Sequence, residues 1–426
     1  MEPEPPDPKT MSSTTPTFSR RLKWRAEWLA QSAAEWIIAR LPGPLVFRVG
    51  SALGSLLWHI MGHRRRIVLK NLRIAFAGEK NLPELRELAR QSFRRSVANL
   101  VSAVHTAHMD YEDLRACVEL ENPELAEATV RRGNGMLLLP PHMGNWEILS
   151  RFNHLFPAGH EVGAFYRPLN NPYLDARLAE KRQSEGTRLF AKRDSLHQVG
   201  AFLKNGGMIG ILADQRVGRQ GVVTSFMGRL TRASPLPRLL IRRCGSTAVA
   251  ISVRTIRPGR WSVRYHPVEE PGDTAACMAA IERAMRESPV DVFWFQDRWK
   301  TYLSPVFGIR DWLDGTEARS DRHPHRALVW LAGGPPEWQI PEAWWHGDLG
   351  YEFVIAEGAQ APSWIPEGAT IHHVPPAASI RDFQRHIVRI DFSKDLPLDF
   401  ILTGNTDEKL RRASRRESIH LIPLAT

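Results

Sequence analysis

The feature of the sequence that most constrains the fold is an alternation of short apolar runs with helix-like stretches between residues 136 and 253. Each apolar run has the length of a single strand. The runs lie at residues 136–139, 162–166, 187–191, 208–213 and 247–253. The helical stretches lie near residues 145–155, 173–185, 195–204 and 235–244. This order predicts an α/β fold, a mixed sheet covered by helices, with functional residues on loops beyond the carboxyl ends of the strands.

A histidine and a carboxylate follow the first of these runs. Two prolines end the run, His142 comes next, and a Gly-Asn pair then favours the start of a helix that contains Glu147. Side chains five positions apart on one helix point about 140° away from each other, so the two meet only if His142 lies ahead of that helix. Glu147 would then fix the tautomer of the imidazole and leave its other nitrogen free to accept a proton. A lone histidine beside an apolar strand is more often a hydrogen-bonded core residue, so the pair needs supporting context.

Other segments of the chain supply that context. The stretch from His142 to Glu147 resembles the H-x4-D/E signature of glycerolipid and lipid A acyltransferases. Further segments resemble those of the bacterial lipid A (lauroyl/myristoyl-type) acyltransferase family, in the family's order and over roughly residues 20 to 305. They are a basic stretch with an N-L-x-x-A-F element at residues 64–76, a Y-R-P…N-P block at 166–172, a D-Q pair at 214–215 and a G…F-x-G pattern at 221–228.

One position departs from the family pattern. The family usually closes with a tryptophan, a histidine and then R-x-K, whereas this chain has Trp294, Gln296, Arg298 and Lys300 at those places. If the histidine helps to hold a phosphate or the acyl donor, Gln296 donates a hydrogen bond there but never carries a charge. The departure therefore concerns one contact and leaves the resemblance in place.

The resemblance implies an acyltransferase that moves a fatty acyl group from an acyl carrier protein thioester to a hydroxyl of a lipid A precursor or related glycolipid. His142 would be the general base, and Glu147 would orient it and stabilise the imidazolium. No metal and no other cofactor is implied. The residues that the family pattern places around the substrate are Arg167, Asp214, Gln215, Arg298 and Lys300. A basic run between Arg229 and Arg243 is either a further phosphate-binding face or a solvated surface.

Three alternatives remain open from the sequence. The acceptor is equally well a lysophospholipid or a phosphoinositide mannoside, because no motif separates these from lipid A. A catalytically silent, membrane-associated binding protein would also keep the fold, and Gln296 is the one residue that favours it. A metal hydrolase built on His142 and Glu147 is less favoured, because no third ligand follows at a recognisable spacing. No G-x-S-x-G elbow is present, so a covalent acyl-enzyme is not indicated.

Charge points to anionic partners. The net charge is +11, and residues 321–426 hold 11 Lys and Arg against 14 Asp and Glu, which leaves the first 320 residues with 46 against 32. Basic domains bind nucleic acids, anionic membranes or phosphorylated substrates. No zinc-finger spacing or RNA-recognition signature is present, which argues against nucleic acid. An acidic carrier protein and an anionic glycolipid both suit such a surface. Three widely separated cysteines indicate buried apolar residues in a reducing compartment.

The amino-terminal region has the pattern of a membrane-associated segment. Residues 1–17 are polar and rich in proline and are expected to be disordered. Residues 18–40 interleave tryptophans with basic residues, as interfacial helices do. Residues 43–62 have about the length of a transmembrane span but contain proline, arginine and four glycines, which favours a helix lying in the cytoplasmic leaflet of the inner membrane. A span, or a buried globular helix, is the alternative. The basic residues at 63–66 would meet anionic head groups.

The last hundred residues form a region with no assigned activity. Strand-like runs at 327–332, 351–356, 370–374 and 400–403 and a helix at 406–416 predict a small C-terminal α/β unit. We expect its removal to spare acyl transfer. The expected organisation is a disordered segment at 1–17, a membrane-associated helical segment at 18–66, an acyltransferase domain at 67–309, a linker at 310–326 and the small α/β domain at 327–426. Residues 84–132 are expected to be helical.

Overall fold

The computed structural model shows two compact units, and each is assembled from segments that are far apart in the sequence. The first comprises the described residues of Met1–Gly62, Arg90–Asp214 and Ser234–Phe293, and the second those of His63–Ala89, Gln215–Ala233 and Trp294–Thr426. The expected boundaries at residues 66, 309 and 326 stay predictions. The structure describes residues 17–151, 160–166, 169–177, 186–191, 196–217, 221–300, 325–345, 347, 349–405 and 407–423. The expected disordered residues 1–16 and most of the expected linker lie outside them.

The first unit is built on a seven-stranded mixed sheet. Its strand order is β1-β9-β8-β2-β5-β3-β4, and every neighbouring pair is parallel except β8 with β9. Five of these strands match the apolar runs of the sequence, and the prediction of a mixed sheet is confirmed. The strands are β1 (Val118–Glu121), β2 (Met136–Leu139), β3 (Val162–Tyr166), β4 (Arg188–Ala191), β5 (Met208–Gly210), β8 (Thr247–Arg257) and β9 (Arg260–Pro267).

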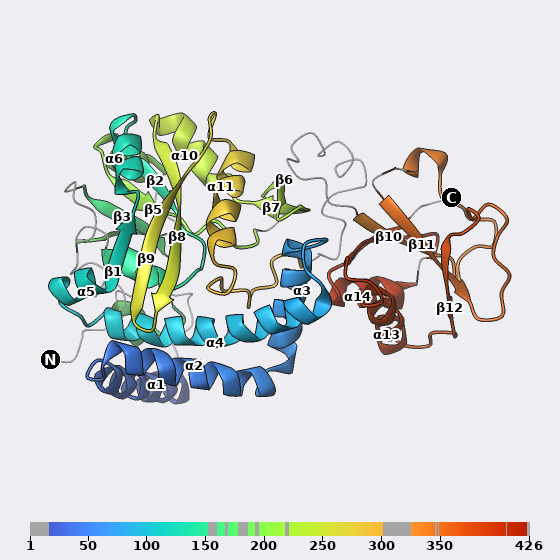
Figure 1. Ribbon diagram of the computed structural model, residues 1–426, viewed down its shortest axis with the longest axis horizontal. Helices are drawn as coiled ribbons and strands as arrows, with labels where there is room; N and C mark the ends of the chain where they lie inside the picture. The colour runs from blue at the N-terminus through green and yellow to red at the C-terminus, as the bar shows by residue number, and fades with distance from the viewer. Residues whose placement is uncertain are drawn as a thin grey trace. The chain divides into compact units, whose positions relative to one another are not determined.

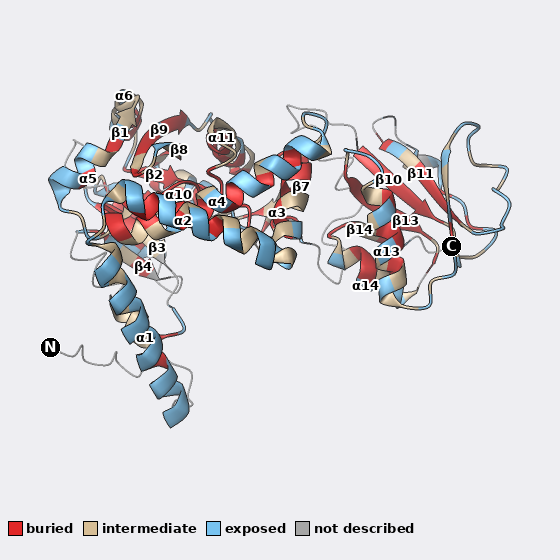
Figure 2. Ribbon diagram, turned by 60° about the horizontal axis from the view of Figure 1, so that its bottom comes forward, coloured by how far each residue is buried: buried red, intermediate tan, exposed pale blue. Residues whose placement is uncertain are grey.

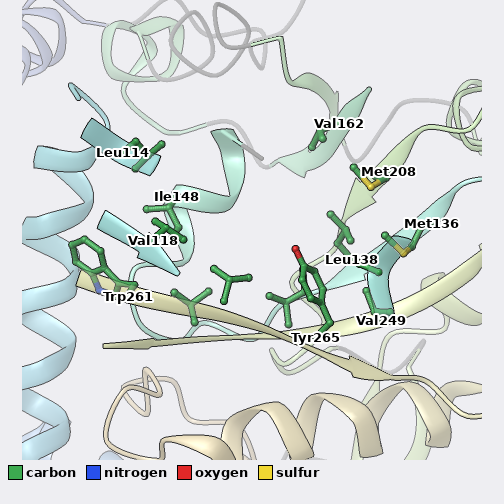
Figure 3. Packing of buried hydrophobic residues seen from close by; sticks show 14 of the residues in the cluster. Leu114, Val118, Met136, Leu138, Ile148, Val162, Met208, Val249, Trp261 and Tyr265 are labelled. Carbon is green, nitrogen blue, oxygen red and sulfur yellow. The ribbon is translucent and has the colours of Figure 1, made fainter. Parts of the chain in front are cut away.

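Helices cover this sheet (Figure 1). All four side chains of β2 are buried, because the strand lies between β8 and β5 and both of its faces are covered. Apolar side chains of the strands and the surrounding helices form one core, in which Ile148 lies beside Val118, and Leu138 lies near Met136 and Val249 (Figure 3). The helices are α4 (Leu82–Thr106), α5 (Tyr111–Cys117), α6 (Pro123–Arg131), α9 (Leu196–Lys204), α10 (Leu236–Cys244) and α11 (Thr274–Glu287). Residues 172–177 are also helical, and the rest of the helix expected at 173–185 lies outside the described residues.

One expectation for this unit was wrong. Residues 84–132 are not helical throughout, because β1 interrupts them between α5 and α6. The strand has only four residues, and its alternating Val-Glu-Leu-Glu sequence carries too little apolar pattern to stand out among helical neighbours. Its backbone pairs along β9, a strand that the apolar runs also did not predict. Pairing with a distant strand therefore decided the structure of this stretch.

Of the two amino-terminal helices, α2 (Gly43–Ile60) runs beside α4, and the carboxyl end of α1 (Phe18–Ile38) meets that of α4, where Nδ1 of His105 lies 3.1 Å from the carbonyl oxygen of Ile38. A Cβ atom at Gly50 would lie 2.7 Å from the Cα of Ala98, and one at Gly54 would lie 2.7 Å from the Cα of Arg94. The two glycines, one helical turn apart, therefore allow α2 to pack directly on the backbone of α4. In contrast, α1 is exposed along most of its length (Figure 2).

Neither of these helices passes a test of length and apolarity for a membrane span, and the same holds for every single helix of the described chain. The pair formed by α2 and α3 (Gly62–Ala75) passes that test only when the two are taken together, and they are bent by 99° at the break between them.

The second unit contains a five-stranded parallel sheet with the strand order β12-β11-β10-β13-β14. Its core is formed by apolar side chains of the strands and of two helices, α13 and α14. The prediction of a small C-terminal α/β unit is confirmed, although α13 and β14 were not foreseen. The elements are β10 (His325–Trp330), β11 (Leu349–Ala356), β12 (Thr370–Val374), α13 (Ile380–Asp391), β13 (Leu398–Thr403), α14 (Glu408–Arg416) and β14 (His420–Pro423).

Segments from the family-like region belong to this second unit as well. The hairpin of β6 (Val222–Phe226) and β7 (Arg229–Ala233) is one of them, and Val223 packs against the core of the C-terminal sheet. Arg229 of this hairpin forms a buried ion pair with Asp399, at 2.7 Å. Arg73 of α3 is 1% exposed and donates to a carboxylate oxygen of Asp391, at 2.5 Å. The C-terminal sheet and these segments of the family-like region therefore pack within one unit.

Candidate active site

The site begins with two neighbouring parallel strands. β2 and β5 pair in register, with Leu138 opposite Gly210, and the amide of Ile211 donates to the carbonyl of Leu138 at 2.8 Å. Because parallel strands end at the same edge of a sheet, the residues that follow them emerge side by side. His142 follows β2 and Asp214 follows β5. The expectation that both lie beyond the carboxyl ends of parallel strands is confirmed.

His142 and Asp214 make two hydrogen bonds. The imidazole Nδ1 of His142 lies 2.8 Å from one carboxylate oxygen of Asp214, and the backbone amide of His142 donates to the other at 3.0 Å. One carboxylate thus fixes both the main chain and the ring of the histidine. A carboxylate partner requires the proton on Nδ1, which leaves Nε2 of the neutral ring as the acceptor. The two side chains are 13% and 11% exposed, so the pair is shielded but reachable.

Charge and burial act on this histidine in opposite directions. Burial lowers the pKa of His142, and the Asp214 carboxylate, through its charge and its hydrogen bond, together with the charge of Glu147 raises it. The charges prevail, and the pKa of His142 lies above its ordinary value. A base with a raised pKa holds a proton more tightly once it has taken it up, as a general base near neutral pH should.

Glu147 has a different relation to His142 from the one expected. It lies in the first turn of a 3₁₀ helix, η2 (Trp146–Arg151), so the expected change from loop to helix after His142 is present. The carboxylate on Nδ1, however, is that of Asp214 and not that of Glu147. Glu147 acts on the imidazole as a second negative charge. The contact with Nδ1 that sequence proximity suggested for Glu147 is thus made by Asp214, and a catalytic role of Glu147 stays a prediction.

Aromatic and backbone contacts complete the surroundings of His142. The ring of Trp146 meets the imidazole edge to face, with 5.2 Å between ring centroids, and Phe293 lies next to Trp146. Gly144 has a φ of +58°, and a Cβ atom there would lie 2.1 Å from the carbonyl oxygen of Val253. Only glycine fits at this point of the loop, for both reasons. The loop between β2 and η2 is therefore held in one path.

The other residues expected at the substrate differ in their surroundings. Arg167 lies outside the described residues. Gln215 and Lys300 are exposed. Arg298 is buried, donates to the hydroxyl of Thr231 at 2.6 Å and covers the ring of Phe226. The basic run from Arg229 to Arg243 does not form one solvated face, because Arg229 is buried in an ion pair with Asp399. Substrate binding by Arg167, Gln215, Arg298 and Lys300 stays a prediction.

The segment that contains Gln296 is held by the N-L-x-x-A-F element. The side-chain amide of Asn71 donates to the carbonyl oxygens of Trp294 and Gln296, at 2.8 and 2.5 Å. Phe76 of the same element meets Trp294 edge to face. Two motifs that lie more than two hundred residues apart therefore form one structural feature. Asn71 reaches only backbone atoms of the closing segment, so this anchoring is indifferent to the replacement of histidine by Gln296.

No group of three or more His, Cys, Asp and Glu side chains in the described ranges is arranged to hold a metal ion. The chemistry that the described residues of the first unit do provide is that of a carboxylate-supported imidazole on a constrained loop.

Comparison with known proteins identifies the family of the chain. Residues 15–301 match the profile of the bacterial lipid A biosynthesis acyltransferases. The chain is 24% identical over 298 residues to a lipid A biosynthesis lauroyltransferase of Escherichia coli, a match that covers 67% of this chain and 96% of the relative. It is 22% identical over 301 residues to a lipid A biosynthesis palmitoleoyltransferase of E. coli, with 67% and 95% covered, and equally similar to a lipid A biosynthesis acyltransferase of Shigella flexneri. The chain therefore belongs to the bacterial lipid A biosynthesis acyltransferase family and is an acyltransferase.

Proposed function

We propose that this acyltransferase moves a fatty acyl group from an acyl carrier protein thioester to a hydroxyl of a lipid A precursor, with His142 as the general base. The observation that carries the proposal is the bond from Nδ1 of His142 to Asp214, which leaves Nε2 to act on the acceptor. The family membership supports the acyl chemistry and the lipid A pathway. The carrier-protein donor and the lipid A acceptor are the finer parts of the proposal.

The reaction follows from these two residues. Nε2 of His142 takes the proton of the acceptor hydroxyl as its oxygen attacks the thioester carbonyl. The tetrahedral intermediate collapses, the C–S bond breaks, and the imidazolium returns its proton to the leaving thiolate. The ester product and the free carrier thiol balance the atoms. Asp214 keeps the ring in one tautomer and stabilises the imidazolium, and Glu147 adds a second negative charge to that stabilisation.

Substrate binding is assigned to residues other than His142 and Asp214. Arg167 belongs to the Y-R-P…N-P block of the family pattern and comes directly after β3 in the sequence. We assign it to phosphates of the acceptor or to the developing oxyanion. Gln215, Arg298 and Lys300 keep the supporting roles that the family pattern gives them.

We further propose that the first unit binds the cytoplasmic face of the inner membrane through α1 and α2. Large apolar side chains on both helices are exposed, although such groups are normally buried. On α2 they recur every three to four residues and so share one face. The basic residues of α1 suit anionic head groups. The exposed side chains are Phe18, Leu22, Leu29, Trp36 and Ile37 on α1, and Leu45, Val49, Leu53, Leu56 and Ile60 on α2.

The reaction is tested with radiolabelled acyl groups. Wild-type protein is incubated with labelled acyl carrier protein and, in separate reactions, with a tetra-acylated lipid A precursor and a lysophospholipid. We expect label in the lipid A product. Label in the lysophospholipid alone would overturn the proposed acceptor, and transfer from acyl coenzyme A in preference to the carrier protein would overturn the proposed donor. No transfer to either lipid would favour the silent-binder interpretation.

A further inference from the structure

The loop that carries His142 is held against a second segment of the first unit, residues 291–293. We propose that Asp291 is a positioning residue for the reaction and that its buried carboxylate sets the distance between His142 and Asp214. The inference rests on the proposed role of His142 as the base. Asp291 lies outside the pair itself, and no motif of the sequence singled it out.

Backbone contacts join the two segments. The amide of Gly144 donates to the carbonyl of Asp291 at 2.9 Å, and the amide of Phe293 donates to the carbonyl of His142 at 2.8 Å. Between them, Met143 and Val292 form an antiparallel bridge. The main chain of His142 thus has two partners: its carbonyl accepts from Phe293, and its amide donates to Asp214. A displacement of residues 291–293 moves His142 relative to Asp214.

The side chain of Asp291 fixes this segment to the rest of the unit. It is 2% exposed, and its carboxylate accepts hydrogen bonds from the amide and hydroxyl of Thr255 at 3.0 and 2.7 Å, from the hydroxyl of Ser288 at 2.8 Å and from the side-chain amide of Asn99 at 3.2 Å. Arg95 lies 3.9 Å away. These groups come from α4, from β8 and from the turn after α11. A buried carboxylate requires such partners, and four donors make its position well determined.

The network reaches further into the core. The side-chain oxygen of Asn99 accepts the indole hydrogen of the buried Trp261 at 2.8 Å, so Asn99 is itself fixed. The loop of His142 has little room to move away from residues 291–293, because Gly144 is pressed against the carbonyl of Val253. His142 is consequently held by a rigid scaffold in addition to its contacts with Asp214. Residues that hold a reacting group within a fraction of an ångström contribute to turnover without contacting substrate.

The test replaces Asp291 by Asn, which keeps the volume but removes the charge. Ser288→Ala removes one donor to the same carboxylate, and Ser246→Ala, which loses a buried hydrogen bond to Asn134, is the matched control away from the loop. Each purified full-length variant is examined for unfolding in urea and for kcat and KM. The reactivity of His142 toward diethyl pyrocarbonate is followed from pH 5 to 9 by mass spectrometry of the peptide that contains it. This last readout needs no acyl transfer.

We expect Asp291→Asn to lower kcat by about 10- to 100-fold with little change in KM. The titration of His142 should move toward lower pH, because a longer distance to Asp214 removes part of what raises its pKa. Ser288→Ala should shift it less and in the same direction, and Ser246→Ala not at all.

A folded Asp291→Asn protein with an unchanged titration of His142 would overturn the inference. If Asp291→Asn does not fold, an unchanged titration in Ser288→Ala does so. Absence of acyl transfer in the wild type would count against the proposed function alone, because the titration still reports whether Asp291 positions His142.

Discussion

Asp214 contacts His142 at two points, with one carboxylate oxygen 2.8 Å from the imidazole Nδ1 and the other accepting the backbone amide at 3.0 Å. A carboxylate that binds both the ring and the main chain fixes the rotation of the imidazole as well as its tautomer. We therefore propose that the activity of His142 depends on Asp214 rather than on Glu147, which is nearer in sequence.

Replacement of Asp214 by Asn should reduce kcat by about 10³- to 10⁴-fold, because an amide does not hold the required tautomer and does not stabilise the imidazolium. Glu147→Gln should also lower turnover, by removing the second charge, but it leaves Nδ1 held. Steady-state kinetics of the two variants beside the wild type provide the comparison. Near-normal turnover in Asp214→Asn would contradict its assigned role.

The pH dependence has a definite direction. A general base acts in its neutral form, so kcat/KM should rise with pH through the raised pKa of His142. In Asp214→Asn this rise in kcat/KM should move to lower pH. Burial, which lowers the pKa of His142, then outweighs the charge of Glu147, which raises it. Profiles measured between pH 5 and 9 decide the question. A rise that stays in place would mean that another group controls it.

Stability should follow the same linkage. The pKa of His142 is raised on folding, so its contribution to the free energy of unfolding is fully present below the pKa of an unfolded histidine, about 6.5, and is lost as pH rises through the folded value. Asp214→Asn should therefore destabilise the protein more at pH 5.5 than at pH 8.5. Urea unfolding at the two pH values measures this, and an equal effect at both would disagree with the ion pair.

The C-terminal α/β region, residues 327–426, should be required for the stability of the rest of the second unit. Burial raises the pKa of Asp399, but the charge of Arg229 and the partnership with His325 prevail and hold it well below its usual range. Asp399→Asn leaves Arg229 buried beside a neutral group and should cost about 3–5 kcal/mol of unfolding free energy. Combining it with Arg229→Met, which removes both charges, should recover much of that loss in urea unfolding.

The same ion pairs bear on the removal of residues 321–426, for which the sparing of acyl transfer stays a prediction. The truncation takes away Asp391 as well as Asp399, and both Arg73 and Arg229 lose their partners. We expect the truncated chain to unfold at much lower urea concentrations than the whole protein. A truncated chain as stable as the whole protein would show that the C-terminal unit is separable after all.

Membrane binding should depend on the exposed faces of α1 and α2. Leu29→Asp and Leu53→Asp each place a charge on an exposed apolar position and should weaken binding to vesicles that contain phosphatidylglycerol. Gln31→Asp is the matched control, because residue 31 points about 200° away from Leu29 around α1. Vesicle sedimentation measures the three variants. Equal loss in all three would indicate a charge effect without an apolar face.

The apolar pattern predicts much of the fold. The elements that it does not predict depend on contacts with distant parts of the chain. β2 and β5 were predicted because strands buried on both faces read as continuous apolar runs. β1 was missed because its four residues are stabilised by pairing with β9, which lies about 140 residues away. α13, whose sequence alternates basic and apolar residues, was also missed, although a capping box formed by Ser379 and Asp382 marks its start.

The site was predictable to a similar extent. His142 and the sheet edge at which it lies followed from the sequence. Asp214 was given only a supporting role, because nothing in a linear pattern says which carboxylate reaches Nδ1 across two strands. Asp291 could not be predicted for the same reason, because its partners Asn99 and Thr255 lie on elements that meet only in the folded protein.

The most direct test of the account is a single-turnover measurement of acyl transfer by wild type and His142→Ala, with urea unfolding to show that both are folded. We predict transfer of the labelled acyl group to the lipid A precursor by the wild type and a loss of at least about 10³-fold in the variant. Comparable transfer rates in the two folded proteins would contradict the assignment of His142 as the base.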